Sequence, residues 1–305
     1  MEQKEIAEKL QFTFYIVVLL DLLGQSDQLD KFTIFPKTEQ EMEEFRSIYR
    51  RTIGPVLHFR EQIQNLHKNF SKPITIPDTI RNKLTPSQLE LAKKYSRPII
   101  GVQFFSDLAI LKINLAAQKD YSPLFSIHTL FIELAILMLI NIALGDPLRG
   151  AIDVGICVEL SENDLYGQAL SRAYKLESKV ADYSRIVIGK GFINYLDSFE
   201  KAEVQNEEKI LMNFYLALIK EFLAVDTDGK PIFSYLSSGA RRYYQESEGS
   251  LENALKAACQ FIRNAVRQYA QIGEIKLEAR YSRMMDYFKK NDCWRNQDPW
   301  GGGRP

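Results

Sequence analysis

Two repeating patterns of apolar positions run along the chain, and each predicts a different kind of element. Short runs rich in β-branched and aromatic residues predict strands, and Phe12 to Leu20 is the clearest of them. Apolar residues that recur every three to four positions among charged residues predict helices. Strands are expected at 12–20, as a pair across 99–113 with its turn near Ser106 and Asp107, at 148–160, at 185–188 and after the turn at 226–231.

Helices are expected at 38–70 with a break at Gly54-Pro55, within 87–96, at 125–144, at 166–183, at about 207–223, and at 251–271 and 276–290. Because strands and helices alternate, the pattern predicts an α/β (α+β) fold in which helices flank a sheet. We expect one domain over residues 1–240, a helical C-terminal extension over 241–290 and a disordered tail over 291–305.

The stretch from Phe125 to Leu144 is nearly long enough to span a bilayer, but it contains His128, Glu133 and Asn141. These polar groups favour a buried helix, for instance at a subunit interface, over a membrane span. The charged N-terminal segment 1–10 runs into a strand without a small-residue cleavage site, so we expect no signal peptide.

Charge and cysteine content narrow the function classes. The 305 residues include 39 basic and 39 acidic side chains, so no overall charge favours nucleic acid or an acidic membrane as a partner. Cys157, Cys259 and Cys293 are odd in number and scattered, which argues against a disulfide framework and a zinc site. The composition therefore predicts a protein of the reducing cytoplasm.

Asp21 and Asp107 are the first candidates for chemistry, because each follows an apolar, strand-like run. Carboxylate oxygens are preferred ligands of Mg²⁺, and two aspartates on neighbouring strands suit a two-metal site. The alternative is that each aspartate only caps a turn. Phosphate-binding loops of the G-x-x-x-x-G-K-[ST] and G-x-G-x-x-G types do not occur, which disfavours P-loop and Rossmann enzymes.

Four local motifs occur in a suggestive order. They are VVLLDLLG at 17–24, QFFSDLAIL at 103–111, PLRGAIDVG at 147–155 and ENDLYGQALSRAYKLESKVADYSRIVI at 162–188. In this order they resemble the catalytic domain of class III nucleotide cyclases, and most closely the bacterial pyrimidine cyclases of the Pycsar antiphage defence system. The resemblance covers roughly Phe12 to Leu236, and it extends to DGKPIFSYL and ARYSRMMDYF further on.

The resemblance implies a metal site and a dimer. Asp21, Asp107 and the carbonyl of Leu22 would hold two Mg²⁺ or Mn²⁺ ions, and Gly24 would let the backbone approach the phosphates of the substrate. In this family the sites form between two chains arranged head to tail. A homodimer with composite active sites is therefore expected.

Base recognition would fall to Gln103 and Asp164 by the same resemblance. Their donors and acceptors fit uracil, cytosine or adenine, so hydrogen bonding alone does not choose the base. Phe104 and Tyr49 are further candidates for a wall that excludes a purine. The alternative role for Asp164 is to cap a helix that begins near Tyr166.

The helix after Gly167 departs from the family pattern. Ser171 and Lys175 stand where the family carries asparagine and arginine, so charge stabilisation at the α-phosphate would fall to Lys175 or be shared with Arg172. The alternative for Lys175 is an ordinary solvated lysine of the helix. Lys230 stands where the family often has a triphosphate-binding lysine. The alternative is that Lys230 is only a residue of the hairpin turn. For Arg149 we expect a structural salt bridge rather than a contact with phosphate. The run Arg46, Arg50, Arg51 and Arg60 is either a wall of the pocket or a solvated face.

Taken together, the expected function is a metal-dependent cyclase that converts UTP, or next CTP, to a 3′,5′-cyclic monophosphate as a second messenger in antiviral defence. The alternatives are a degenerate cyclase-fold protein that binds a nucleotide or a partner, and a purine cyclase.

Overall fold

The structure is a computed structural model that describes residues 10–24, 35–70, 81–82, 84–116, 121–161, 164–200, 206–245 and 250–291. Its strands form one mixed sheet in the order β2-β3-β1-β4-β6-β8-β7, with β5 paired to β4. The strands are β1 (Thr13–Leu22), β2 (Gly101–Phe105), β3 (Leu108–Asn114), β4 (Leu148–Ser161), β5 (Asp164–Gly167), β6 (Ile186–Ile188), β7 (Leu223–Val225) and β8 (Pro231–Phe233). The prediction of a sheet flanked by helices is confirmed.

The first part of the sheet has the split β-α-β connectivity of ferredoxin-like folds. Strand β1 pairs antiparallel with β3 on one side and with β4 on the other. Strand β2 pairs antiparallel with β3. Strands β1 and β2 are consecutive in the chain, but β3 lies between them in the sheet. Strands β3 and β4 are likewise consecutive, and β1 lies between them. This connectivity places the end of β1 beside the turn between β2 and β3.

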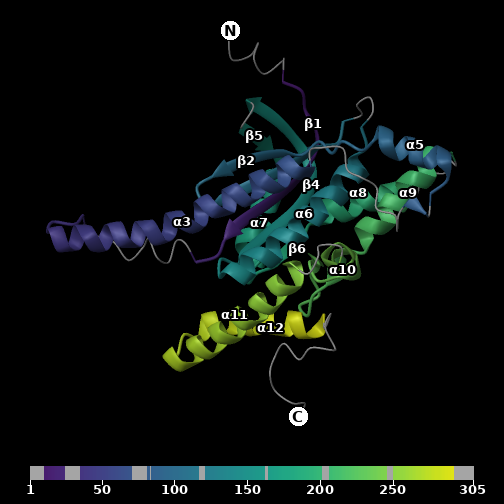
Figure 1. The fold of residues 1–305 in the computed structure, drawn as a ribbon. Helices are drawn as coiled ribbons and strands as arrows, with labels where there is room; N and C mark the ends of the chain where they lie inside the picture. The colour runs from purple at the N-terminus through teal and green to yellow at the C-terminus, as the bar shows by residue number, and fades with distance from the viewer. Residues whose placement is uncertain are drawn as a thin grey trace, which may run out of the picture.

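Helices cover the two faces of the sheet unequally (Figure 1). Side chains of alternate strand residues, such as Ile16, Val18 and Leu20, join the main core beneath α6, whereas Val17 and Leu19 face α7 in a smaller cluster. The helices are α3 (Glu39–Phe70), α5 (Pro86–Lys94), α6 (Pro123–Leu144), α7 (Gln168–Val180), α8 (Lys190–Glu200), α9 (Glu207–Lys220), α10 (Ser238–Gln245), α11 (Ser250–Ile272) and α12 (Ile275–Lys290).

Helix α6 is buried inside the fold, as its polar residues predicted. It is the one helix in the described ranges long and apolar enough to cross a membrane, and 78% of its apolar window is buried. Asn141 donates to Gln62 Oε1 of α3 at 2.7 Å, and His128 Nε2 lies 3.1 Å from the hydroxyl of Tyr243. Helix α11 of the C-terminal extension packs against α6 and joins the same core.

Some sequence predictions about helix ends are wrong. Helix α3 continues through Gly54 and Pro55. Proline removes only one backbone donor, and the carbonyl four residues earlier belongs to Arg51, an exposed residue where water can serve as the donor. Asp164 does not cap a helix, because residues 164–167 pair with β4 as β5 and α7 begins only at Gln168.

Other elements were missed or fall outside the described residues. The sequence patterns did not predict α8, α10 or β5, and the helix expected to reach Leu223 ends at Lys220, so that Leu223 begins β7. The predicted lead-in over 1–9 and the predicted tail from 292 onward lie outside the part of the chain that the structure describes.

Candidate functional site

The candidate site forms where β1 ends beside the turn between β2 and β3. Asp21 pairs in register with Leu108, so Asp107 of the turn lies next to it. Asp21 is 9% exposed, and Asp107 is half-buried. Ser106 adopts the left-handed conformation at φ 54°, which lets two residues connect the strands. The two aspartates predicted to share metal ions are therefore neighbours.

Arg149 and Glu177 complete this cluster. Arg149 pairs in register with Asp21 on the other side of β1, and its Nη2 lies 2.9 Å from Asp21 Oδ2. Its Nε lies 2.7 Å from Oε1 of Glu177, a buried residue of α7. Ala169 and Ala173 precede Glu177 at spacings of four and pack on the sheet, so the helix directs Glu177 to the same face. The salt bridge predicted for Arg149 is confirmed.

Burial controls the electrostatics of the cluster. Burial raises the pKa of Asp21, the Arg149 guanidinium opposes this rise, and Asp107 adds to it. Burial likewise raises the pKa of Glu177 to about 7, with Arg149 lowering it and Asp21 raising it. Asp21 and Glu177 thus share one guanidinium, and Asp107 adds a third carboxyl group nearby, so the cluster has room for additional positive charge.

The donor set fits a hard divalent cation that completes its coordination with phosphate oxygens. Asp21, Asp107 and the carbonyl of Leu22 are oxygen donors, which Mg²⁺ prefers, and Mg²⁺ in phosphate sites needs only one or two protein carboxylates. In the described ranges no group of three or more His, Cys, Asp or Glu side chains is placed to hold a metal ion, so other oxygen atoms would have to complete the coordination. A cation bound here would compete with Arg149 for Asp21.

Helix α3 holds the turn that carries Asp107. Arg60 Nη2 donates to the carbonyl of Ser106 at 2.5 Å, and the Arg60 guanidinium lies over the ring of Phe104, 5.4 Å from its centroid. The ring of Phe104 packs against the main core, on the sheet face opposite Gln103. Phe104 and Gln103, which were predicted to wall the same pocket, therefore lie on opposite faces of the sheet, because successive strand residues face opposite sides.

Gln103 lies on the same face of the sheet as Asp21. It pairs with Ile110, which pairs with Leu19, and Leu19 precedes Asp21 by two residues. The Oε1 atom of Gln103 is buried, and no hydrogen-bond partner for it lies among the residues that the structure describes. A buried acceptor without a donor is costly, so this amide is available to a ligand.

The three candidates on α7 lie on its exposed side. Ser171, Arg172 and Lys175 are exposed, whereas Ala173 between them is fully buried. Arg172 Nη1 lies 3.5 Å from the carbonyl of Val154. Within one chain the helix therefore brings none of these three side chains to Asp21, and their proposed roles require a second chain.

The remaining candidates are spread over the molecule. Gly24 follows β1 at φ +90°, a conformation that suits glycine, with open space where a Cβ would lie. Asp164 is exposed at the start of β5, and Tyr49 is 40% exposed on the half of α3 that extends from the sheet (Figure 1). Lys230 lies in the turn between β7 and β8, and β4 and β6 separate β8 from β1.

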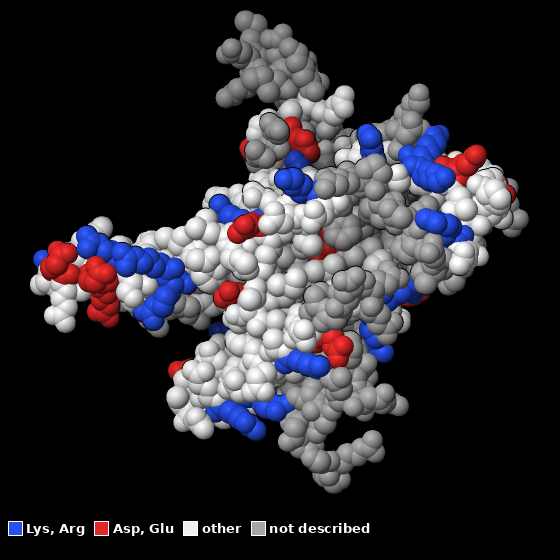
Figure 2. Space-filling model, in the orientation of Figure 1, with Lys and Arg blue, Asp and Glu red and all other residues white. Residues whose placement is uncertain are grey.

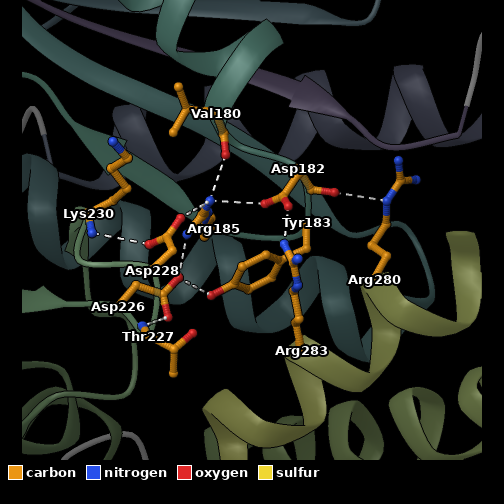
Figure 3. A network of polar contacts seen from close by, with 10 residues as sticks. All are labelled: Val180, Asp182, Tyr183, Arg185, Asp226, Thr227, Asp228, Lys230, Arg280 and Arg283. Carbon is orange, nitrogen blue, oxygen red and sulfur yellow. Dashed lines mark hydrogen bonds and ion pairs between the residues drawn. The ribbon is translucent and has the colours of Figure 1, made fainter.

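The turn around Lys230 belongs to a separate charged network, which sequence reasoning missed (Figure 3). Buried Arg185 reaches Asp226 Oδ2 at 2.5 Å and Asp228 Oδ2 at 2.9 Å. The hydroxyl of Tyr183 donates to Asp226 at 2.6 Å. Arginine within an otherwise apolar strand was the available signal, because a buried guanidinium requires acidic partners.

Comparisons with known proteins do not extend these observations. No protein-family model, curated protein or solved structure matches this chain significantly. The resemblance to class III cyclases therefore rests on the four sequence motifs alone.

Proposed function

We propose that this chain is a metal-dependent nucleotidyl cyclase that converts a pyrimidine nucleoside triphosphate, UTP before CTP, to its 3′,5′-cyclic monophosphate and pyrophosphate. The observation that carries the proposal is the juxtaposition of Asp21 and Asp107. The resemblance to Pycsar cyclases adds the pyrimidine base and a second-messenger role in antiviral defence within the cytoplasm.

The reaction is an attack of the ribose 3′-oxygen on the α-phosphorus, with pyrophosphate as the leaving group. When bound, two Mg²⁺ or Mn²⁺ ions would lower the pKa of the 3′-hydroxyl and neutralise the triphosphate. Asp21, Asp107 and the carbonyl of Leu22 would hold these ions. Arg149, fixed by Glu177, orients the Asp21 carboxylate from the neighbouring strand. Gln103 presents its buried amide oxygen to the base.

A cyclase-fold protein that binds a nucleotide or a partner without turnover is the second candidate. It is favoured by Ser171 and Lys175, which replace the asparagine and arginine of the family and are exposed in one chain. A purine cyclase is a third possibility, since an amide such as that of Gln103 also matches adenine. The retained pair Asp21 and Asp107 favours the enzyme, because a binding protein has less need of two metal-ligand carboxylates.

Product analysis tests the proposal directly. The full-length protein is incubated with ATP, GTP, CTP and UTP in competition with Mn²⁺, and the products are separated by mass. We expect UTP to be cyclised at least about tenfold better than ATP or GTP, a difference of about 1.4 kcal/mol in barrier height. A cyclic purine nucleotide as the main product would contradict the pyrimidine assignment, and no cyclic product from any of the four would contradict the cyclase.

Gln103→Ala refines the same test. Losing the amide should erode the preference for UTP more than it lowers the maximal rate on saturating UTP, because the amide discriminates between bases rather than reacting. Gln268→Ala, at an exposed position of α11, is the matched control and should leave the preference unchanged. An unchanged preference in Gln103→Ala would remove Gln103 from base recognition.

Complementation tests the composite site. If Asp21 and Lys175 act on one substrate from different chains, mixing Asp21→Asn chains with Lys175→Ala chains restores one intact site per heterodimer. Random exchange then recovers about a quarter of the wild-type sites. Mixing Asp21→Asn with Asp107→Asn should restore nothing, because both changes fall in the same half-site. Absence of recovery after verified subunit exchange would argue for a site within one chain or a non-catalytic Lys175.

A further inference from the structure

Three basic side chains of α12 lie in one row, facing the segment that joins α7 to β6. Lys276, Arg280 and Arg283 are spaced by four and three residues, so they share one side of the helix. Asp182, which belongs to the segment between α7 and β6, lies across from them. Together with Ala279, these side chains line a hollow of about 470 Å³. None of the lining residues belongs to the candidate site described above.

The acidic residue of this hollow, Asp182, is already engaged by other groups. Its Oδ1 lies 3.0 Å from Nη2 of the buried Arg185, and its Oδ2 pairs with Nη1 of Arg283 (Figure 3). Its backbone carbonyl accepts a hydrogen bond from Nε of Arg280 at 3.0 Å. One carboxylate is therefore shared by two guanidinium groups, and it has little charge left to offer a third cation.

The hollow consequently carries more positive than negative charge. Arg280 contacts only a neutral carbonyl, and Lys276 is exposed; neither forms an ion pair within the described residues. These two cations stand four residues apart, and like charges at that spacing repel each other on a helix surface. Glu278 is two residues from each of them, so it points to another side of the helix. An anion in the hollow would relieve the repulsion.

The chemistry of the lining favours a small phosphorylated anion. Guanidinium groups bind phosphate oxygens through paired N–H donors, and a lysine adds a compact positive charge. On the face drawn in Figure 2, basic and acidic side chains are interspersed rather than gathered in a continuous basic track. A nucleic acid favours such a track, because its phosphates repeat along a chain. No aromatic or amide side chain lines the hollow, so it offers nothing to recognise a base.

We infer that Lys276, Arg280 and Arg283 form a binding site for the diphosphate group of a small molecule, recognised without a divalent cation. A diphosphate suits three cations better than a single phosphate does, because it carries more charge over a greater length. Asp182 would compete with this anion, because both bind Arg283. The inference does not depend on the proposed cyclase chemistry, since its evidence lies in α12 and the segment facing it.

Calorimetric titration of the full-length protein with inorganic pyrophosphate in EDTA tests this site. EDTA removes divalent cations, so the candidate cyclase site cannot hold pyrophosphate through metal ions. Arg280→Gln should weaken binding at least about tenfold, because it removes a charged pair of donors. Arg267→Gln, at an exposed position of α11, is the matched control and should bind as the wild type does. Asp21→Asn should also bind normally, because Asp21 does not line the hollow.

Asp182→Asn gives a change in the opposite direction. It should bind pyrophosphate more tightly than the wild type, because the competing charge is lost while the shape of the side chain is kept. Equal affinities for pyrophosphate and UDP would show that the diphosphate alone is recognised, and tighter binding of UDP would identify a nucleotide as its source.

Three results would overturn the site. They are absence of pyrophosphate binding by the wild type, full affinity in Arg280→Gln, and loss of binding in Asp21→Asn, which would place the anion at the candidate site instead. Binding of a glutamate-rich peptide but not of pyrophosphate would assign the basic row to a protein partner. None of these readouts uses cyclase activity, so failure of the proposed function leaves the test valid.

Discussion

Replacing Asp21 or Asp107 by asparagine is expected to lower cyclisation of UTP by on the order of a thousandfold or more. Either change removes one of the two carboxylates expected to hold both cations, and with it the stabilisation of charge on the attacking and leaving oxygens. The fold should survive, because asparagine has nearly the same shape and Arg149 keeps its contact with Glu177. Initial rates with Mn²⁺, measured beside thermal melting curves, separate the two effects.

The control for these variants is Asp286→Asn, which changes an exposed aspartate of α12 and should leave turnover unchanged. A different result would follow if Asp21 served only the ion pair with Arg149. Asp21→Asn would then lower the melting temperature while turnover stayed near that of the wild type. That outcome would remove Asp21 from the catalytic assignment and favour the nucleotide-binding alternative.

The wild-type protein is expected to lose stability between pH 5 and pH 8, and replacing Glu133 by glutamine should remove most of this loss. Glu133 lies in the middle of α6 and is 5% exposed, and its Oε1 has no hydrogen-bond partner within the described part of the chain. Burial raises its pKa from 4.5 to about 8. The unfolded chain therefore releases this proton near pH 4.5 and the folded chain only near pH 8, so the free energy of unfolding falls as pH rises through this window.

The size of the effect follows from the same shift. Each pKa unit corresponds to about 1.4 kcal/mol, so the wild type should lose about 3 kcal/mol more than Glu133→Gln between pH 5 and pH 8. Urea unfolding at several pH values measures this difference. His128, whose pKa burial lowers to about 3, contributes equally to both proteins and cancels. Glu61→Gln, at an exposed position of α3, should show no such change in slope. Parallel curves for wild type and Glu133→Gln would show that Glu133 ionises normally.

The outcome for Glu133 also bears on the apolar helix. Its polar residues were reason to expect a buried helix rather than a membrane span, and the structure buries α6 beneath the sheet and α11. A neutral carboxyl inside a protein core is costly but tolerable, because protonation avoids burying a charge. The sequence shows that an apolar segment contains a glutamate, although it does not show which elements cover this helix.

Elements with local signals could be predicted from the amino-acid sequence. The strand before Asp21, the hairpin around Ser106 and Asp107, and the long helix of residues 39–70 follow from side-chain periodicity and turn residues, which act over a few positions. The sequence also singled out Asp21 and Asp107, since a carboxylate after an apolar strand is unusual in a local window. The break expected at Gly54-Pro55 failed because tertiary anchoring of the later half outweighs a local helix breaker.

Which of these residues come into contact depends on tertiary packing. Glu177 joins Asp21 because α7 crosses the sheet with its alanine face inward. Phe104 lies on the face opposite Gln103 because the register of β2 turns it to the core. Arg60 reaches the Asp107 turn from a helix 46 residues earlier than Ser106. Such contacts depend on strand register and helix placement, which the packing of the whole chain sets, so no local pattern of residues carries them.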